Sequence, residues 1–202
     1  KESRASGGRP LEAAKRLNAL IKGGYLDQSL VNDMMIYAQE ISGVKVGYYT
    51  DLAGAEFALN NGHFYNAMQK YQYFFSNVIA PRKVDFSNYR YRWALSAYKA
   101  KIFQPAIDIL EKLQRKKNLN PELDVASVKL LYAVYSAKED SGSGSAQNRK
   151  KLRIAAKRFV RKSPTDPDAD SARLLIAQTT SNAKSALKSL NQISSKKLKS
   201  DV

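Results

Sequence analysis

The sequence predicts an all-α protein in which about five pairs of helices stack on one another. Three observations predict this class. Apolar residues recur three and four positions apart in successive segments, as they do on one face of a helix. Glycine, asparagine or proline separates these segments, and no segment shows the strict apolar–polar alternation of a strand. One helical pair cannot bury its own apolar face, so each pair needs neighbours.

The composition divides the chain into three parts. Residues 1–9 (KESRASGGR) are polar and contain glycine, and we expect a disordered linker there. Residues 10–194 carry the helical-repeat pattern, and residues 195–202 form a basic tail. In the first predicted pair, Pro10 begins a helix that runs to residue 22, and Asp27 caps a second helix that runs to residue 41.

The clearest pair lies in residues 52–75, LAGAEFALNNGHFYNAMQKYQYFF. Small side chains such as Ala55 recur on one face of its first helix, and large aromatic ones such as Tyr71 on one face of its second. Gly62 lies between them and can adopt the left-handed conformation that ends a helix. We therefore expect a close-packed hairpin, preceded by a connector at residues 43–49.

The later helices follow in order. They are predicted at residues 88–99, 104–116, 121–137, 147–162, 169–179 and 183–193. Asn120 followed by Pro121 is a strong signal for the start of a helix. Residues 138–146 (KEDSGSGSA) are expected to form a flexible loop, and residues 164–168 a connector.

Part of this pattern resembles the tetratricopeptide repeat. The residues that carry the resemblance are Ala55, Gly62, Phe64, Ala67, Tyr71 and Phe74, with a second set at Ala94, Phe103, Ala106, Leu110 and Leu113. In the second set Lys101 stands in place of the turn glycine, so we expect a looser or differently built turn. Ala67 and Ala106 lie 39 residues apart where the family repeat has about 34, and the excess is predicted at residues 80–85. The resemblance covers about a third of the chain and implies a right-handed α-solenoid of about five hairpins.

The resemblance also implies a concave face on which peptides dock. Tyrosine suits such a face, because it offers a large rigid surface and a hydroxyl group. The other aromatic residues, such as Trp93, are interpreted as core. The predicted partner-binding residues are Tyr49, Glu56, Asn60, Asn88, Tyr91, Tyr98 and Lys99.

The net charge of +16 indicates affinity for nucleic acid, anionic lipid, acidic polysaccharide or an acidic protein. The predicted helix at residues 147–162 carries eight Lys or Arg and no acid. Like charges four residues apart cost about 0.2–0.5 kcal/mol each, so we favour an anionic partner over a merely solvated surface. The predicted basic patch consists of Lys150, Arg153, Lys157, Arg158 and Arg161.

A second basic cluster at residues 82–118 has ten Lys or Arg against three acids. Within it, Arg90 and Arg92 alternate with aromatic residues, an order that would suit stacking on single-stranded nucleic acid. No nucleic-acid-binding motif accompanies the cluster. Sequence alone leaves open whether the two clusters form one patch.

Catalysis has little support in the sequence. There is no cysteine, no phosphate-binding glycine loop and no nucleophile elbow, and His63 is the only histidine. Asp166, Asp168 and Asp170 alternate as in a calcium loop but lack its glycine and distal glutamate, and they are interpreted as a connector and helix cap. We expect no enzyme activity, cofactor, metal or membrane-spanning segment.

The predicted function is that of a non-enzymatic, tetratricopeptide-like adaptor. It would bind a protein or peptide on its concave face and an acidic partner on its basic, convex helix. The alternative is a protein that binds an anionic polymer, such as RNA, DNA, a cell-wall polymer or lipid headgroups. The first residue is Lys1 rather than methionine, which favours export to the bacterial periplasm or surface over the cytoplasm. Oligomeric state is left open.

Overall fold

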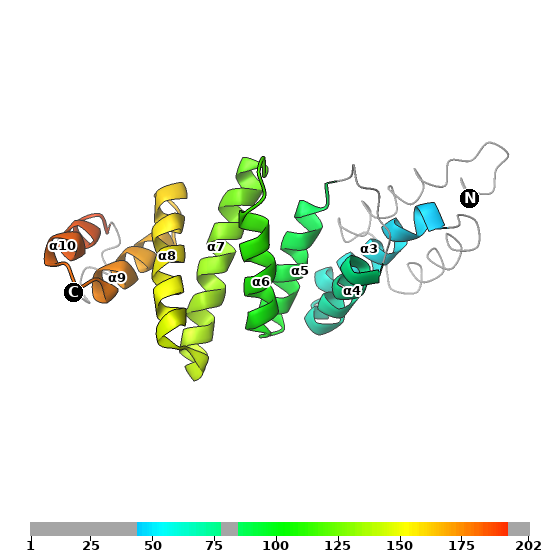
Figure 1. The fold of residues 1–202 in the computed structure, drawn as a ribbon, viewed down its shortest axis with the longest axis horizontal. Helices are drawn as coiled ribbons and strands as arrows, with labels where there is room; N and C mark the ends of the chain where they lie inside the picture. The colour runs from blue at the N-terminus through cyan, green and yellow to red at the C-terminus, as the bar shows by residue number, and fades with distance from the viewer. Residues whose placement is uncertain (1–43, 78–84, 194–202) are drawn as a thin grey trace. The chain divides into compact units, whose positions relative to one another are not determined.

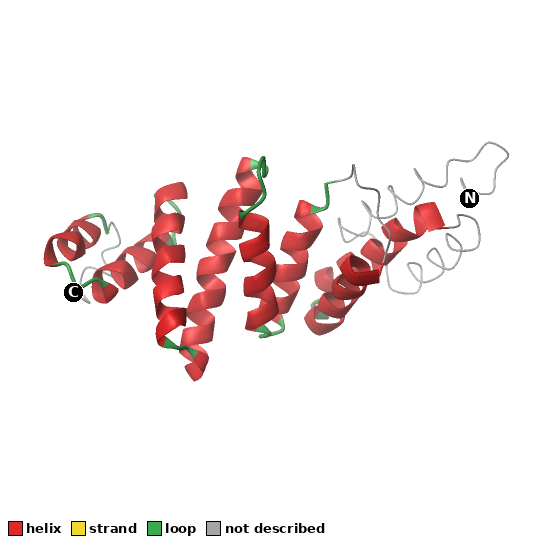
Figure 2. Ribbon diagram, viewed as in Figure 1, coloured by secondary structure: helices red, strands yellow, loops and turns green. Residues whose placement is uncertain are grey.

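The computed structural model describes residues 44–77 and 85–193 of the chain. Within these ranges it contains eight α-helices, one π-helical turn and no strand (Figures 1 and 2). The all-α prediction is confirmed for this part of the molecule. The helices predicted at residues 10–22 and 27–41, the linker, the basic tail and most of the insertion predicted at residues 80–85 lie outside the described residues.

The chain forms two compact units, Lys1–Ile102 and Phe103–Val202. In unit 1, α3 packs on α4 and α4 on α5; in unit 2, each of the five helices packs on the next (Figure 1). The helices of unit 1 are α3 (Val44–Asn60), α4 (Phe64–Asn77) and α5 (Ser87–Lys99). Those of unit 2 are α6 (Phe103–Gln114), α7 (Pro121–Lys138), α8 (Ala146–Lys162), α9 (Ala169–Thr179) and α10 (Ala183–Asn191).

The core of unit 1 is the predicted pairing of small and aromatic faces. Ala55 and Ala58 of α3 are buried against Tyr71 and Phe74 of α4. Burying an aromatic side chain of this kind contributes about 1.5–3 kcal/mol of transfer free energy, and the small alanines let the two backbones approach closely. The predicted hairpin is therefore confirmed.

The N-terminal part of α3 differs from the prediction. The helix begins at Val44, so the connector expected at residues 43–49 is wrong for nearly its whole length. Glycine at position 47 costs a helix about 1 kcal/mol, but α3 packs along α4. Tertiary packing of this kind outweighs a weak local preference.

The two turns of unit 1 have the same backbone geometry. Gly62 has φ +77° and Lys101 has φ +61°, and each turn is closed by an amide that donates to the carbonyl five residues back. These hydrogen bonds run from His63 N–H to Ala58 O and from Ile102 N–H to Ala97 O, each at 2.9 Å. The expectation of a differently built turn at Lys101 is wrong. The lysine adopts the left-handed conformation, at a cost of about 1–2 kcal/mol.

Helix α7 starts and ends within one residue of the prediction, and the segment after it differs. The side chain of Asn120 accepts hydrogen bonds from the amides of Glu122 and Leu123, as an N-cap does. After α7, most of the flexible loop expected at residues 138–146 is instead a π-helical turn, η1 (Glu139–Ser143), and two extended residues, Gly144 and Ser145, connect it to α8. Gly142 permits this turn, because its φ is +73°.

Candidate functional site

Glu56, predicted to contact a partner, is fully buried. Its carboxylate accepts a short hydrogen bond from the hydroxyl of Tyr71 and one from Nε of Arg92 at 2.6 Å. A buried carboxylate is tolerated only when it is paired and hydrogen-bonded. Glu56 therefore cannot touch a partner directly in this structure, and it acts as a junction between α3, α4 and α5.

The electrostatics of this junction follow from burial. Burial raises the pKa of Tyr71, and the neighbouring Glu56 charge raises it further. Burial lowers the pKa of Arg92, but the Glu56 charge and the Tyr71 hydroxyl outweigh burial, so that the net shift is upward. Tyr71 is therefore a neutral donor and Arg92 a permanent cation.

The other predicted partner-binding residues keep some exposure. Asn60 is exposed and its Oδ1 accepts a hydrogen bond from Nη2 of Arg92 at 3.1 Å. The side chains of Asn88 and Lys99 are exposed, and those of Tyr91 and Tyr98 are half-buried. Tyr49 lies on α3, in the stretch where only the backbone is described.

The arginines proposed to stack on nucleic acid have partners within unit 1. The guanidinium carbon of Arg90 lies 4.4 Å from the centroid of the Phe75 ring, and Phe75 also stacks on Trp93 with centroids 5.3 Å apart. Arg92 holds Glu56. Both arginines thus have partners within unit 1, and the nucleic-acid interpretation of this stretch stays a prediction.

The basic helix α8 divides its eight cations into two groups. Four of them contact neighbouring elements. These contacts are Arg149 Nε to Glu139 at 3.0 Å, Lys151 Nζ to Glu111 at 2.9 Å, Arg153 Nη1 to the carbonyl of Thr179 at 2.9 Å, and a short contact from Lys162 Nζ to Asp124. Arg153, predicted as part of the basic patch, is half-buried and faces α9 instead.

The other four cations are Lys150, Lys157, Arg158 and Arg161, and all four are exposed. Among the residues that the structure describes, no carboxylate lies within 4.0 Å of any of them. The structure thus places four of the five residues of the predicted basic patch on the solvent side of α8.

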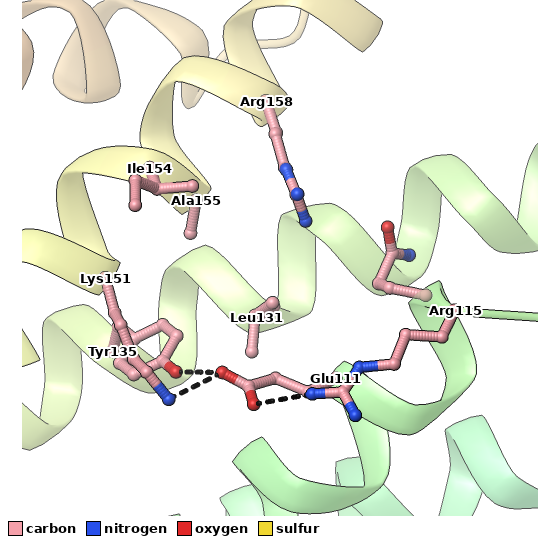
Figure 3. A pocket seen from close by; sticks show the side chains of 9 residues that line it. Glu111, Arg115, Leu131, Tyr135, Lys151, Ile154, Ala155 and Arg158 are labelled. Carbon is pink, nitrogen blue, oxygen red and sulfur yellow. Dashed lines mark hydrogen bonds and ion pairs between the residues drawn. The ribbon is translucent and has the colours of Figure 1, made fainter.

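A groove runs beside these cations between α6 and α8, with α7 at its floor. It consists of two adjoining pockets of about 380 Å³ each, which share Gln114 and Arg158. The first is lined by Glu111, Gln114, Arg115, Leu131, Tyr135, Lys151, Ile154, Ala155 and Arg158 (Figure 3). The second is lined by Gln114, Lys116, Asn118, Leu119, Asp124, Arg158, Arg161 and Lys162. We call the two pockets together the cationic groove.

Glu111 organises one end of the cationic groove. Its Oε1 accepts hydrogen bonds from the Tyr135 hydroxyl at 2.7 Å and from Lys151 Nζ at 2.9 Å, and its Oε2 lies 3.8 Å from Nη2 of Arg115 (Figure 3). Burial alone would raise the pKa of Glu111, but the Tyr135 and Lys151 hydrogen bonds and the charges of Lys151 and Arg115 lower it below its usual value. Lys151 is therefore neutralised, whereas Arg158 has no carboxylate partner among the described residues.

Sequence reasoning missed the α6 and α7 side of this groove. Glu111 and Tyr135 lie far from α8 along the chain and belong to no recognisable motif. Arg115 and Lys116 belong to the second basic cluster, and here they share the groove with Arg158 and Arg161. Part of the second cluster thus joins the first in one surface.

Residues 164–168 form the predicted connector between α8 and α9, and Asp168 is the N-cap residue of α9, but its side chain does not cap the helix. Lys129 Nζ lies 2.8 Å from Asp166 and 2.9 Å from Asp168, and Asp170 pairs with Arg173 at 2.6 Å. Within residues 44–77 and 85–193, no group of three or more His, Cys, Asp or Glu is placed to hold a metal ion. No described helix combines the length and the apolar character that crossing a membrane requires.

Comparison of the chain with protein-family models finds no match. Comparisons with curated proteins and with solved structures likewise find none. The similarity to the tetratricopeptide repeat therefore stays a resemblance carried by the residues named above.

Proposed function

We propose that this protein is a non-enzymatic helical-repeat adaptor, and that helix α8 and the cationic groove beside it bind an acidic segment of a partner protein. The observation that carries the proposal is the group of four exposed cations on α8 that have no carboxylate within reach in the described part of the chain. Like charges so closely spaced destabilise a helix. An anionic partner offsets that cost when it binds.

The composition of the cationic groove favours a protein partner over a continuous polyanion. Glu111 and Asp124 lie in its walls and pair with Lys151 and Lys162, so fewer cations are left for a continuous chain of phosphates. Leu131, Ile154 and Ala155 form an apolar part of the lining, and this part suits an aliphatic side chain. Phe159 is fully buried and stacks on Tyr132 with centroids 5.6 Å apart, and neither ring lines the groove, so neither is offered to a base.

The predicted surface on α5 is a second proposed contact. Asn88, Tyr91, Tyr98 and Lys99 lie on that helix and are exposed or half-buried. Replacing both Tyr91 and Tyr98 with Ala should reduce partner capture at least tenfold while changing the melting temperature little, because neither side chain is fully buried. If the melting temperature falls in proportion to capture, these residues are core.

The adaptor proposal is tested by capture from a lysate at two salt concentrations, with and without nuclease. The test variant reverses Lys150, Lys157, Arg158 and Arg161 to Glu. The matched control reverses four other exposed lysines, Lys70, Lys112, Lys184 and Lys188, and so changes the net charge equally. We expect the test variant to lose an identified acidic protein that the control retains.

Two outcomes would contradict the proposal. Equal loss in both variants would mean that only net charge matters. Capture that disappears with nuclease, or whose logarithm falls steeply and linearly with the logarithm of salt concentration, would assign the surface to an anionic polymer.

A further inference from the structure

We infer that the cationic groove is a docking groove for an extended acidic peptide segment that carries an aliphatic side chain between its acidic residues. The inference rests on the proposed function and deepens it, because it names the chemistry of the segment that is bound. Three features of the groove carry it: the adjoining pockets, the apolar lining and the distribution of unpaired charge.

The first feature is the continuity of the groove. Gln114 of α6 and Arg158 of α8 line both pockets. The two pockets therefore adjoin beside these two side chains. Each pocket has about 380 Å³, which suits a few side chains of an extended segment rather than a folded surface.

The second feature is an exposed aliphatic side chain that lies among the exposed cations of α8. Ile154 is 44% exposed and lines the first pocket together with Leu131 and Ala155 (Figure 3). The core of unit 2 is formed by other residues, such as Phe159 and Ala156, and does not include Ile154. An aliphatic side chain of the ligand placed here would remove this surface from water.

The third feature is that carboxylates in the groove pair with some of its cations and leave others without a carboxylate partner. Lys151 is held by Glu111, and Lys162 by Asp124. Arg158 and Arg161 have no carboxylate partner among the described residues, and Arg115 has one only at 3.8 Å. In Figure 3, Arg158 extends from α8 towards the groove and makes no bond to the other residues drawn.

The unpaired cations in the groove are therefore guanidinium groups, which bind carboxylates through two parallel hydrogen bonds. Arg158 stands where the two pockets meet. A carboxylate of the ligand fits beside Arg158, and its aliphatic neighbour fits beside Ile154. The occupant is thus an acidic segment with mixed character, not one of uniform charge.

The test uses the full chain and a fluorescein-labelled peptide in which leucine separates pairs of glutamates. A second peptide has serine in place of each leucine and the same charge. Binding is followed by fluorescence anisotropy at low salt. We expect the leucine peptide to bind at least fivefold more tightly than the serine peptide.

The protein variants are two charge reversals of the same size. Arg158→Glu changes a residue that lines the groove, and Lys112→Glu changes an exposed lysine of α6 that does not line it. We expect Arg158→Glu to weaken leucine-peptide binding at least tenfold and Lys112→Glu less than threefold. Ile154→Ser should weaken the leucine peptide and leave the serine peptide unchanged. Melting temperatures check that each variant is folded.

The inference is overturned by any of three results: no binding of the leucine peptide to the wild-type chain, equal affinity of the two peptides, or equal loss in the two charge variants. If the charge variants behave alike but the fourfold reversal still abolishes capture of an acidic protein, the inference of a docking groove is wrong and the adaptor proposal stands. If the peptide binds as expected but the fourfold reversal leaves capture unchanged, the adaptor proposal fails instead.

Discussion

The two compact units place their charged side chains differently. In unit 1, Glu56 is fully buried and is held by Tyr71 and Arg92, so one carboxylate joins three helices. In unit 2, α8 presents Lys150, Lys157, Arg158 and Arg161 to solvent without a carboxylate in reach among the described residues. Unit 1 thus buries a charge that joins three helices, whereas unit 2, which has ion pairs of its own, leaves four cations of α8 available.

This difference sets what each charge contributes to stability. Removing one partner of a buried pair leaves an uncompensated charge in a medium of low dielectric constant, which costs several kcal/mol. Removing an exposed cation changes little, since water screens it. Substitutions in unit 1 should therefore change the free energy of unfolding, and those on α8 should change binding.

The largest expected effect is at the buried pair. Arg92→Leu leaves Glu56 without its cation and should lower the free energy of unfolding by about 3 kcal/mol, measured by urea denaturation. The double variant with Glu56→Leu as well should recover much of this loss, because no buried charge then remains. A loss below about 1 kcal/mol in the single variant would show that the carboxylate is not confined as the structure places it.

The next effect is at Glu111 and depends on pH. Glu111→Gln should lower the free energy of unfolding by about 1–2 kcal/mol at neutral pH, since it removes a charge-assisted hydrogen bond and an ion pair. The folded pKa of Glu111 is lowered, so this stabilisation is fully present above the ordinary carboxyl pKa and is lost as pH falls through the folded pKa. The difference between wild type and variant should therefore shrink below about pH 4.

Another carboxyl group of unit 2 also titrates in this pH range. The pKa of Asp166 is lowered, because the Lys129 hydrogen bond outweighs its burial. This pair is present in both proteins, so its contribution cancels in the difference between their free energies of unfolding. A difference that does not change with pH would show that Glu111 acts through its shape and not its charge.

A third effect separates backbone strain from charge within unit 1. Lys101→Gly relieves the left-handed lysine and should raise the free energy of unfolding by about 1 kcal/mol after the entropy of the added glycine is counted. Gly62→Ala should lower it by a similar amount. No atom lies within 4 Å of a Cβ added at Gly62, so only the backbone conformation opposes this substitution. Changes of the same sign in the two variants would contradict the shared turn geometry.

The smallest effect is on α8. Lys157 stands four residues from both Arg153 and Arg161, so Lys157→Glu replaces two repulsions with two attractions. We expect a gain of about 0.5–1 kcal/mol in the free energy of unfolding, measured by thermal denaturation at low salt, and a smaller gain at high salt because salt screens exposed charges. A loss of stability at low salt would show that Lys157 has a structural role.

Much of the fold could be predicted from local patterns. The alternation of small and aromatic faces predicted the α3–α4 hairpin, and Asn120 before a proline predicted the start of α7. Both signals act within a few residues, so one sequence suffices to see them. The start of α3 was missed because the glycine at position 47 lowers the local helix preference.

The candidate site was predictable only on its α8 side. Eight cations without an acid are visible in the sequence, but their division into paired and unpaired groups depends on acids such as Glu111 and Asp124 on other helices. Glu56 was misplaced for the same reason. A glutamate on a helix is usually exposed, and only the approach of Arg92 from α5 makes its burial possible.

The junction at Glu56 has a consequence for how unit 1 moves. Tyr71 belongs to α4 and Arg92 to α5. If either helix separated from α3, the buried carboxylate of Glu56 would lose one of its hydrogen bonds. We therefore expect local opening of a single helix to be suppressed, and the backbone amides of α3, α4 and α5 to exchange with solvent as one cooperative group.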